Sequence, residues 1–172
     1  MKKRILFLLS VLLVTALLAS PVSAGGGVGL TRVQFSLGSL IATGDVKGIG
    51  NTDVTMVLDA SGTPLITCIN NGDNSVPGQS SPKVSASGSQ LLNGNDPLRK
   101  NGKAAFFTET DDPETLSWDV AGCPNSNWTG HIDFIFWTDA TISVLDTSTQ
   151  ALLLKQAYTC TTTRTSVSCT PK

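Results

Sequence analysis

Apolar and polar residues alternate with a period of two along most of the chain. Val54, Met56 and Leu58 share one parity, against Thr55 and Asp59. Because successive side chains of a β-strand point to opposite faces, this alternation predicts half-buried strands. The same signature predicts strands around Val33–Leu37 and at Leu65–Ile69, Lys83–Gly88, Lys103–Thr110, Trp128–Thr138, Ala140–Asp146, Leu152–Cys160 and Arg164–Cys169.

Turn signals separate these segments. Clusters of Gly, Asn, Asp and Pro, which tolerate turn conformations, stand at residues 60–62, 93–97, 101–102 and 111–113. The longest expected loop covers residues 70–82, which are rich in Asn, Gly, Ser and Pro. A loop of that length in a compact domain is often functional.

The pattern indicates an all-β fold. No window after residue 24 keeps a helical period of 3.6, and Thr, Ser, Gly and Asn outnumber the strong helix formers. Many short strands between turns are typical of an antiparallel β-sandwich, Ig-like or Greek-key in its connections. We expect residues 30–172 to form this single domain, preceded by a flexible segment at 25–29.

The first residues have the order of a secretory signal peptide. Lys2, Lys3 and Arg4 form a positive region, the apolar run Ile5–Leu18 follows, and small residues lead up to Ala24. We expect residues 1–24 to be cleaved and the protein to be secreted, with membrane contact only through this peptide; an uncleaved membrane anchor is the alternative. The expected mature chain carries nine basic residues against 13 acidic ones, a net charge of about −4, so we expect no nucleic-acid partner.

Four cysteines, all after residue 24, allow three pairings. An even number of cysteines in an exported chain indicates disulfides. Cys160 and Cys169 flank a short polar stretch that can close as a hairpin clasp, which leaves Cys68 for Cys123. A zinc site is the alternative, but the cysteine spacing lacks a close pair and the chain has a single histidine.

Two stretches of the sequence are distinctive. Residues 68–79 read Cys-Ile-Asn-Asn-Gly-Asp-Asn-Ser-Val-Pro-Gly-Gln, and residues 121–129 read Ala-Gly-Cys-Pro-Asn-Ser-Asn-Trp-Thr. Together they resemble a set of small secreted bacterial proteins without a known activity. The resemblance spans about residues 48–144 and implies export and a Cys68–Cys123 bridge, but no chemistry. Asp73, Ser80 and the Cys160–Cys169 pair depart from that pattern.

The same stretches supply the candidate ligand-binding residues. If Cys68 bonds Cys123, two amide-rich loops meet at one end of the sandwich. The simpler interpretation is turn chemistry, because Asn and Gly tolerate positive φ and Asn side chains cap turns. The functional interpretation is a polar rim that binds a glycan through amide hydrogen bonds. This rim would comprise Asn70, Asn71, Asp73, Asn74, Gln79, Asn125 and Asn127.

Two tryptophans lie on opposite parities of one expected strand. Trp128 shares its parity with Ile132, which predicts core packing. Trp137 shares its parity with His131, so a regular strand would turn it outward as a surface anchor for a ligand or partner. The alternative is a β-bulge near Gly130 or Trp137 that switches the faces.

Cofactor and catalytic signals are weak. Oxygen ligands for calcium cluster at residues 71–74, 93–96 and 111–114, but none of these clusters matches a calcium-binding loop, so we predict no metal or other cofactor. No nucleophile elbow surrounds any serine, and His131 is the only histidine. We therefore predict a non-catalytic recognition module whose partner is a glycan or another extracellular protein. The alternatives are a small secreted hydrolase with an acid pair, and an accessory protein or inhibitor of an exported enzyme.

Overall fold

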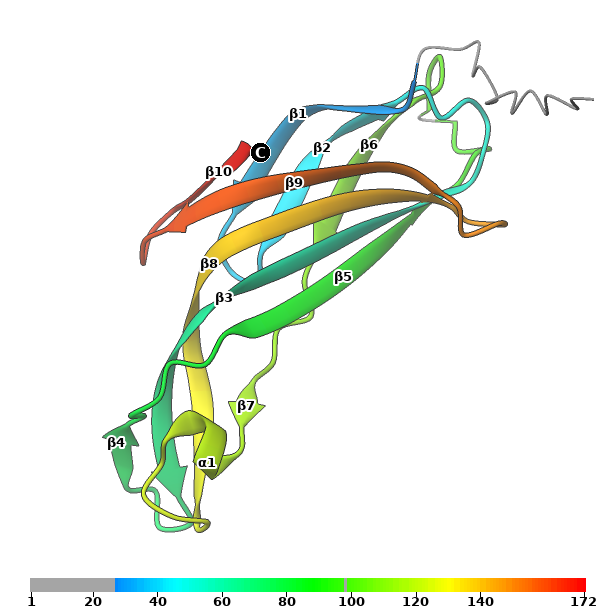
Figure 1. Ribbon diagram of the computed structural model, residues 1–172. Helices are drawn as coiled ribbons and strands as arrows, with labels where there is room; N and C mark the ends of the chain where they lie inside the picture. The colour runs from blue at the N-terminus through cyan, green and yellow to red at the C-terminus, as the bar shows by residue number, and fades with distance from the viewer. Residues whose placement is uncertain (1–26, 98) are drawn as a thin grey trace, which may run out of the picture.

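The computed structural model describes residues 27–97 and 99–172 (Figure 1). The expected signal peptide lies outside these residues, and Gly29, expected in the flexible segment, begins the first strand. The described part contains one helix, α1 (Trp118–Ala121), and no helix long and apolar enough to cross a membrane. The strands are β1 (Gly29–Ser36), β2 (Ile41–Lys47), β3 (Val54–Asn70), β4 (Ser75–Pro77), β5 (Val84–Leu92), β6 (Lys103–Glu109), β7 (Thr115–Leu116), β8 (Trp128–Asp146), β9 (Leu152–Thr162) and β10 (Val167–Pro171).

Two antiparallel sheets pack face to face to form the body of the molecule (Figure 1). The smaller sheet has the order β1-β2-β6. The larger has the order β10-β9-β8-β3-β4, with β5 paired to β3 and β7 to β8. The two sheets meet along two seams, each formed by the edge strands of both sheets. Along the seam between β5 and β6 the sheets are linked, because Asp111 N donates to Ser87 O at 3.0 Å and Phe107 N donates to the Gln90 side chain at 2.8 Å. The prediction of an all-β, disulfide-stabilised sandwich is confirmed.

The core of the body follows the alternation seen in the sequence. On β3, Val54, Met56 and Leu58 have no exposed surface, while Asp59 between the buried positions faces solvent. They pack with side chains of the same kind from both sheets. Burying such large apolar groups stabilises a fold by about 1.5–3 kcal/mol each. The largest fully buried partners are Leu40, Val46, Trp137, Ile142 and Val144.

Two breaks that the sequence predicted between strands are wrong. β3 continues through residues 60–62, where a turn was expected, and β8 joins the two strands expected at 128–138 and 140–146. At Gly62 an added Cβ would lie 2.5 Å from the carbonyl oxygen of Phe136. This glycine therefore permits a close approach of two paired strands rather than a turn.

One strand of the body has no counterpart among the predictions. β2 contains Gly44 and Asp45, which break the alternation, and two consecutive residues, Asp45 and Val46, are buried. The Asp45 side chain is 6% exposed and forms ion pairs with Arg32 and Lys103. Arg32 reaches it from a bulge in β1, where its φ of 56° is left-handed. A buried charge needs such partners, so tertiary contacts allow Asp45 in the strand.

The long strands β3 and β8 continue beyond the sandwich as an arm (Figure 1). We define the arm as residues 64–81 and 114–134, which add β4, β7 and α1 to these strands. It has a small core of its own, made by Ile66, Cys68, Ala121 and Cys123 with Leu116 and Trp128 packed against it. The expected loop at residues 70–82 is thus only partly a loop, because β4 pairs with β3 there.

Both predicted disulfides are present. Cys68–Cys123 closes the arm, with the two Cα atoms 5.6 Å apart and a sequence separation of 55. Cys160–Cys169 links directly opposite residues of β9 and β10, with Cα atoms 4.0 Å apart. Within the described residues no cysteine is free. Structural disulfides are typical of an oxidising, extracellular environment.

Two buried threonines on the β6 side of the core provide a matched test of buried hydroxyls. Thr108 Oγ1 has no hydrogen-bond partner among the described residues, whereas Thr110 Oγ1 accepts from Leu40 N at 2.9 Å and donates to Asp112 at 2.6 Å. Each is 2% exposed. We expect Thr108→Val to raise the free energy of unfolding by about 1 kcal/mol and Thr110→Val to lower it by a similar amount. Urea unfolding of both variants measures this, and equal losses would contradict it.

Candidate binding site

The far end of the arm brings together two loops that the sequence predicted to meet. Asn70, the last residue of β3, is paired with Trp128, the first residue of β8. The loop at 71–74 leaves this pair on one side and the loop at 124–127 on the other. Six of the predicted rim residues therefore lie at the tip of the arm: Asn70, Asn71, Asp73, Asn74, Asn125 and Asn127.

The side chains of two of these residues hold the loops themselves. Asn70 Oδ1 accepts from Gly72 N at 2.9 Å and from Asn74 N at 3.0 Å. Asn125 Oδ1 accepts from Asn127 N at 3.0 Å in the other loop. Asx-type hydrogen bonds of this kind stabilise turns without a ligand. The contacts thus account for part of the amide cluster by turn chemistry, the simpler of the two interpretations.

Gln79 does not belong to the tip. Its backbone N–H donates to Gly122 O at 3.3 Å, and its side chain donates to Pro77 O at 3.1 Å. The segment around it instead fastens the end of α1 to β3, because Gly78 N donates to Ile66 O at 2.9 Å. Close packing depends on glycine here, since a Cβ on Gly130 would lie 2.3 Å from the Cβ of Ala121.

The prediction of Trp137 as a surface anchor is wrong. Trp137 is 1% exposed and belongs to the core of the body. The register between β3 and β8 shifts between Leu65 and Ile66, which leaves Asp133, between His131 and Trp137, unpaired as a bulge. A bulge moves the following side chains to the other face, so parity counted from His131 fails at Trp137. The core packing predicted for Trp128 agrees with its contact on the arm cluster.

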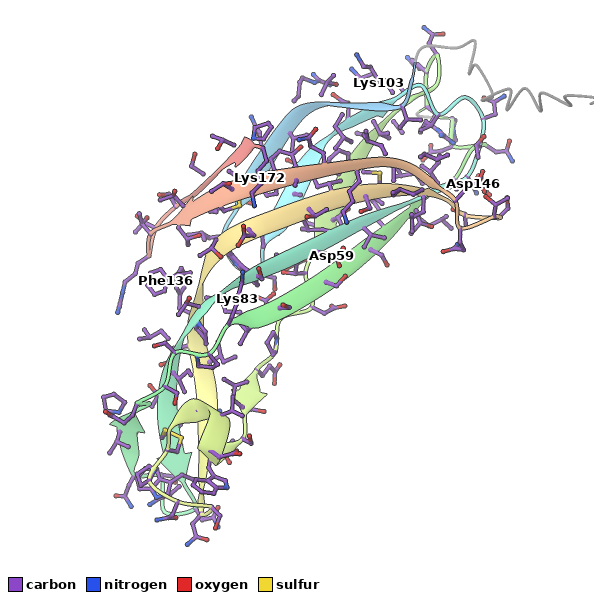
Figure 2. All side chains as sticks on the ribbon, viewed as in Figure 1. Asp59, Lys83, Lys103, Phe136, Asp146 and Lys172 are labelled. Carbon is purple, nitrogen blue, oxygen red and sulfur yellow. A yellow bond between two sulfur atoms is a disulfide. The ribbon has the colours of Figure 1, made fainter. Side chains whose placement is uncertain are left out.

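The arm exposes apolar side chains that the sequence did not single out. Trp118 is 41% exposed and Val120 is 44% exposed, both on α1, and Leu65 and Val76 are exposed on β3 and β4. The sequence feature that could have indicated α1 is the stretch from Ser117, which precedes the helix, to Gly122, which follows it. Gly122 closes the helix with a φ of 66°. Phe136, labelled in Figure 2 near the base of the arm, stacks edge to face with Phe134, with ring centres 4.9 Å apart. Exposed apolar groups gathered on one projecting element are typical of interaction surfaces.

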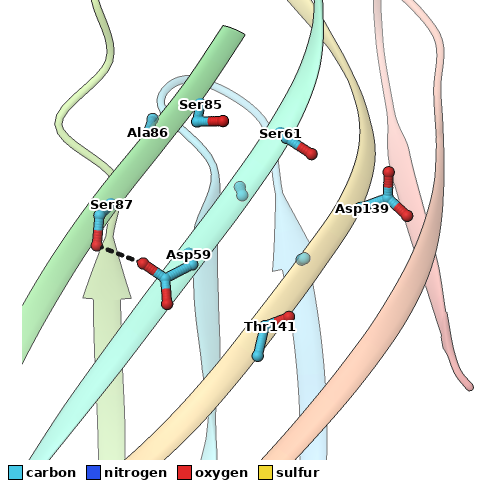
Figure 3. Close-up of a pocket in the computed structure, with 9 residues that line it drawn as sticks. Asp59, Ser61, Ser85, Ala86, Ser87, Asp139 and Thr141 are labelled. Carbon is cyan, nitrogen blue, oxygen red and sulfur yellow. Dashed lines mark hydrogen bonds between the residues drawn. The ribbon is translucent and has the colours of Figure 1, made fainter. Parts of the chain in front are cut away.

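A shallow polar groove of about 340 Å³ crosses the outer face of the larger sheet (Figure 3). Ser87 Oγ donates to Asp59 at 2.7 Å, and Asp139 is ion-paired with Lys83 at 3.2 Å and Lys172 at 2.8 Å. The hydrogen bond from Lys172, with those from Thr138 and Lys83, holds the pKa of Asp139 below its usual range. This low pKa keeps Asp139 ionised near neutral pH.

A second hollow, of about 380 Å³, lies where the arm joins the body and is lined by Asp112, Glu114 and Asp133. Burial raises the pKa of Asp112 against the hydrogen bond from Thr110, and the charges of Glu109 and Asp111 raise it further. This hollow gives the acid-pair hypothesis a carboxyl with a raised pKa. The bond from Thr110, which also holds Leu40 N, gives Asp112 a structural role as well.

In the described residues no group of three or more His, Cys, Asp or Glu side chains has an arrangement that could hold a metal ion. The oxygen-rich loops proposed for calcium serve turns in part, as Asn93 does in accepting from Asn95 N at 2.9 Å. That the protein binds no calcium or other cofactor stays a prediction.

Comparisons with known proteins add little. No protein-family model matches the chain, and no curated protein matches it. Among solved structures, the chain is similar to a calcium-binding mutant of Bacteroides uniformis beta-glucuronidase 2, with 12% identity and a TM-score of 0.27. The match covers 78% of this chain but 13% of that one. A TM-score this low supports no argument about fold or function.

Proposed function

We propose that this protein is a secreted, non-catalytic recognition module and that its arm contacts an extracellular protein. The observation that carries the proposal is the arm itself, a disulfide-closed extension that presents Trp118 and Val120 to solvent beyond the sandwich. Exposed apolar groups gain no stability from burial, so their concentration on a projecting element supports a role in contacting a partner. Tryptophan is also among the residues most enriched in binding hot spots.

A protein partner is favoured over a glycan by the hydrogen bonds at the tip. The side-chain oxygens of Asn70 and Asn125 are occupied by backbone donors, so part of the predicted sugar-binding rim is already committed. The exposed groups on α1 are apolar, with Asp119 between them. The hydrogen bond from Ser117, with one from the backbone of Val120, lowers the pKa of Asp119, so it is charged near neutral pH. Two apolar side chains, Trp118 and Val120, beside the charged Asp119 form a mixed surface of the kind that contacts other proteins.

The test compares binding of the labelled protein to the surface of the producing cells and of their neighbours. We expect Trp118→Ala combined with Val120→Ser to weaken binding by at least about tenfold, since hot-spot truncations often cost 2 kcal/mol or more. The matched control is Leu91→Ser with Phe107→Ser, which removes two exposed apolar side chains from the body.

Pretreatment of the cells identifies the class of partner. Protease should abolish binding and glycosidases should leave it intact if the partner is a protein. Equal losses in the arm and body variants, with unchanged thermal midpoints, would contradict a role of the arm. Loss of binding after glycosidase treatment alone would return the glycan interpretation.

A further inference from the structure

The body is open along its second seam, between β1 and β9. β10 pairs with β9 only from Tyr158 to Thr162, and the last backbone contact is Lys172 N donating to Ala157 O at 3.0 Å. In the part of the chain that the structure describes, the outer edge of β9 from Leu152 to Gln156 has no ladder partner, and β1 pairs with β2 alone.

Unpaired backbone groups line this seam. Backbone N–H and C=O groups of alternate strand residues point to the same side. Because the carbonyl of Ala157 points outward to Lys172, the backbone groups of Lys155 also point outward, into the open seam. Leu152 is 57% exposed and Leu153 is 39% exposed on the same strand. An unpaired apolar edge is a template for a further strand, which soluble proteins usually cover or block.

A groove that could hold an extended peptide runs along this seam. Its volume is about 520 Å³, and it is bounded by β1 on one side and by β9 and β10 on the other. Leu30, Val33, Leu154 and Cys169 form its floor, where they are partly buried against the core. A strand laid here would cover apolar surface and satisfy backbone groups at once, the two sources of affinity in strand addition.

The charges around the seam indicate the kind of strand. The residues that line it include two cations, Arg32 and Lys47, and no carboxylate. Arg32 is ion-paired with Asp45, so Lys47 and the neighbouring exposed Lys155 supply the net positive charge. The chain as a whole carries more acidic than basic residues. This local excess of positive charge favours an acidic ligand.

We propose that the β1–β9 seam binds an extended acidic segment of a partner protein, which pairs with the outer edge of β9 as an additional strand. Alternate apolar side chains of this segment contact Leu30, Val33 and Leu154, and its carboxylates face Lys47 and Lys155. This site is separate from the arm, so the two proposals stand or fall independently.

The test uses the exported protein and a synthetic nonapeptide that alternates glutamate with valine. Fluorescence anisotropy should show saturable binding, and the amide of Lys155 should become protected from hydrogen exchange. A peptide with lysine in place of glutamate should bind at least about tenfold more weakly, as should the glutamate peptide N-methylated at alternate backbone positions. Lys47→Glu should weaken binding of the glutamate peptide, whereas Arg164→Glu, in the exposed hairpin turn, should not.

On the protein side, Lys155→Pro removes the outward N–H and should abolish binding. Ser89→Pro is its matched control, because Ser89 shares parity with Ser87, whose carbonyl points away from β3 to Asp111. Should Lys155→Pro lower the thermal midpoint, the N-methylated peptide decides alone. The proposal is overturned if the N-methylated peptide binds as well as the parent, if no peptide binds, or if the Lys155 amide is already protected before peptide is added.

Discussion

Removing the Cys68–Cys123 disulfide is expected to unfold the arm and to leave the body folded. The arm has only a small apolar cluster of its own, and two of its four buried members are the bonded cysteines. α1 is connected to the sheet by this bond, by a few backbone contacts and by packing on Gly130. The core of the body, by contrast, contains 20 buried residues from both sheets and depends on none of these contacts.

The expected size of the effect follows from the loop that the bond closes. In the chain-entropy model, a loop with a sequence separation of 55 corresponds to about 4 kcal/mol. The variant Cys68→Ala with Cys123→Ala should therefore speed hydrogen exchange of the arm amides by up to about a thousandfold. Amides of β5 and of residues 139–146 in β8 should change far less. A simultaneous loss of protection in arm and body would show that they unfold as one unit.

The second disulfide provides the matched control. Cys160→Ala with Cys169→Ala opens a separation of nine residues, for which the same model gives about 3 kcal/mol. Cys160 is buried in the core of the body, so this variant should lower the thermal midpoint of the sandwich and loosen β10. It should leave exchange in the arm unchanged. The two variants thus map their losses onto different parts of the molecule.

Asp45→Asn is expected to lower the free energy of unfolding by about 2–3 kcal/mol at neutral pH. Asp45 is the buried acid of the body, and Arg32 Nε donates to it at 2.5 Å while Lys103 Nζ lies 3.4 Å away. Asparagine keeps the shape but removes the charge that both cations face. The substitution also weakens the ion pair that offsets the left-handed backbone conformation of Arg32. That conformation costs about 1–2 kcal/mol for such a residue. The expected loss stays below the usual range for broken buried pairs because the side chains of Arg32 and Lys103 are 74% and 46% exposed.

The pH dependence of this effect has a definite sign. Burial alone raises the pKa of Asp45, but the hydrogen bond and charge of Arg32 and the charge of Lys103 outweigh it and hold that pKa below 3.8. A folded-state pKa below the unfolded value gives stability that is complete above about pH 4 and is lost as the pH falls through the folded pKa. Urea unfolding should therefore show wild type and Asp45→Asn converging as the pH is lowered from 4 toward 2.

Asp139→Asn is the control for burial. Asp139 also has two lysine partners, at 2.8 and 3.2 Å, but it lies on the exposed face of the larger sheet. Solvent screens exposed pairs and the long lysine side chains lose entropy in forming them. We expect a much smaller loss than at Asp45. A loss as large as that of Asp45→Asn would mean that burial is not what makes the Asp45 cluster stabilising.

The local pattern of the sequence was sufficient for the strands that bury one face. Alternation is a property of neighbouring residues, so β5, β6 and β9 were predicted close to their observed positions, and both disulfides were predicted from cysteine number and spacing. Features that depend on partners distant in sequence were not predicted. β2 was missed because its buried Asp45 is acceptable only beside Arg32 and Lys103, and Gly62 was assigned to a turn because its close contact with Phe136 is tertiary.

The candidate sites show the same division. The sequence by itself indicated that the loops at 71–74 and 124–127 meet, because a bond between Cys68 and Cys123 requires it. Only the tertiary structure decided that they meet at the tip of an arm and that a bulge turns Trp137 into the core. It also decided that β9 keeps an open edge beside β1. Bulges, strand lengths and seams are set by how two strands fit against each other, and that fit is not encoded in the periodicity of either strand alone.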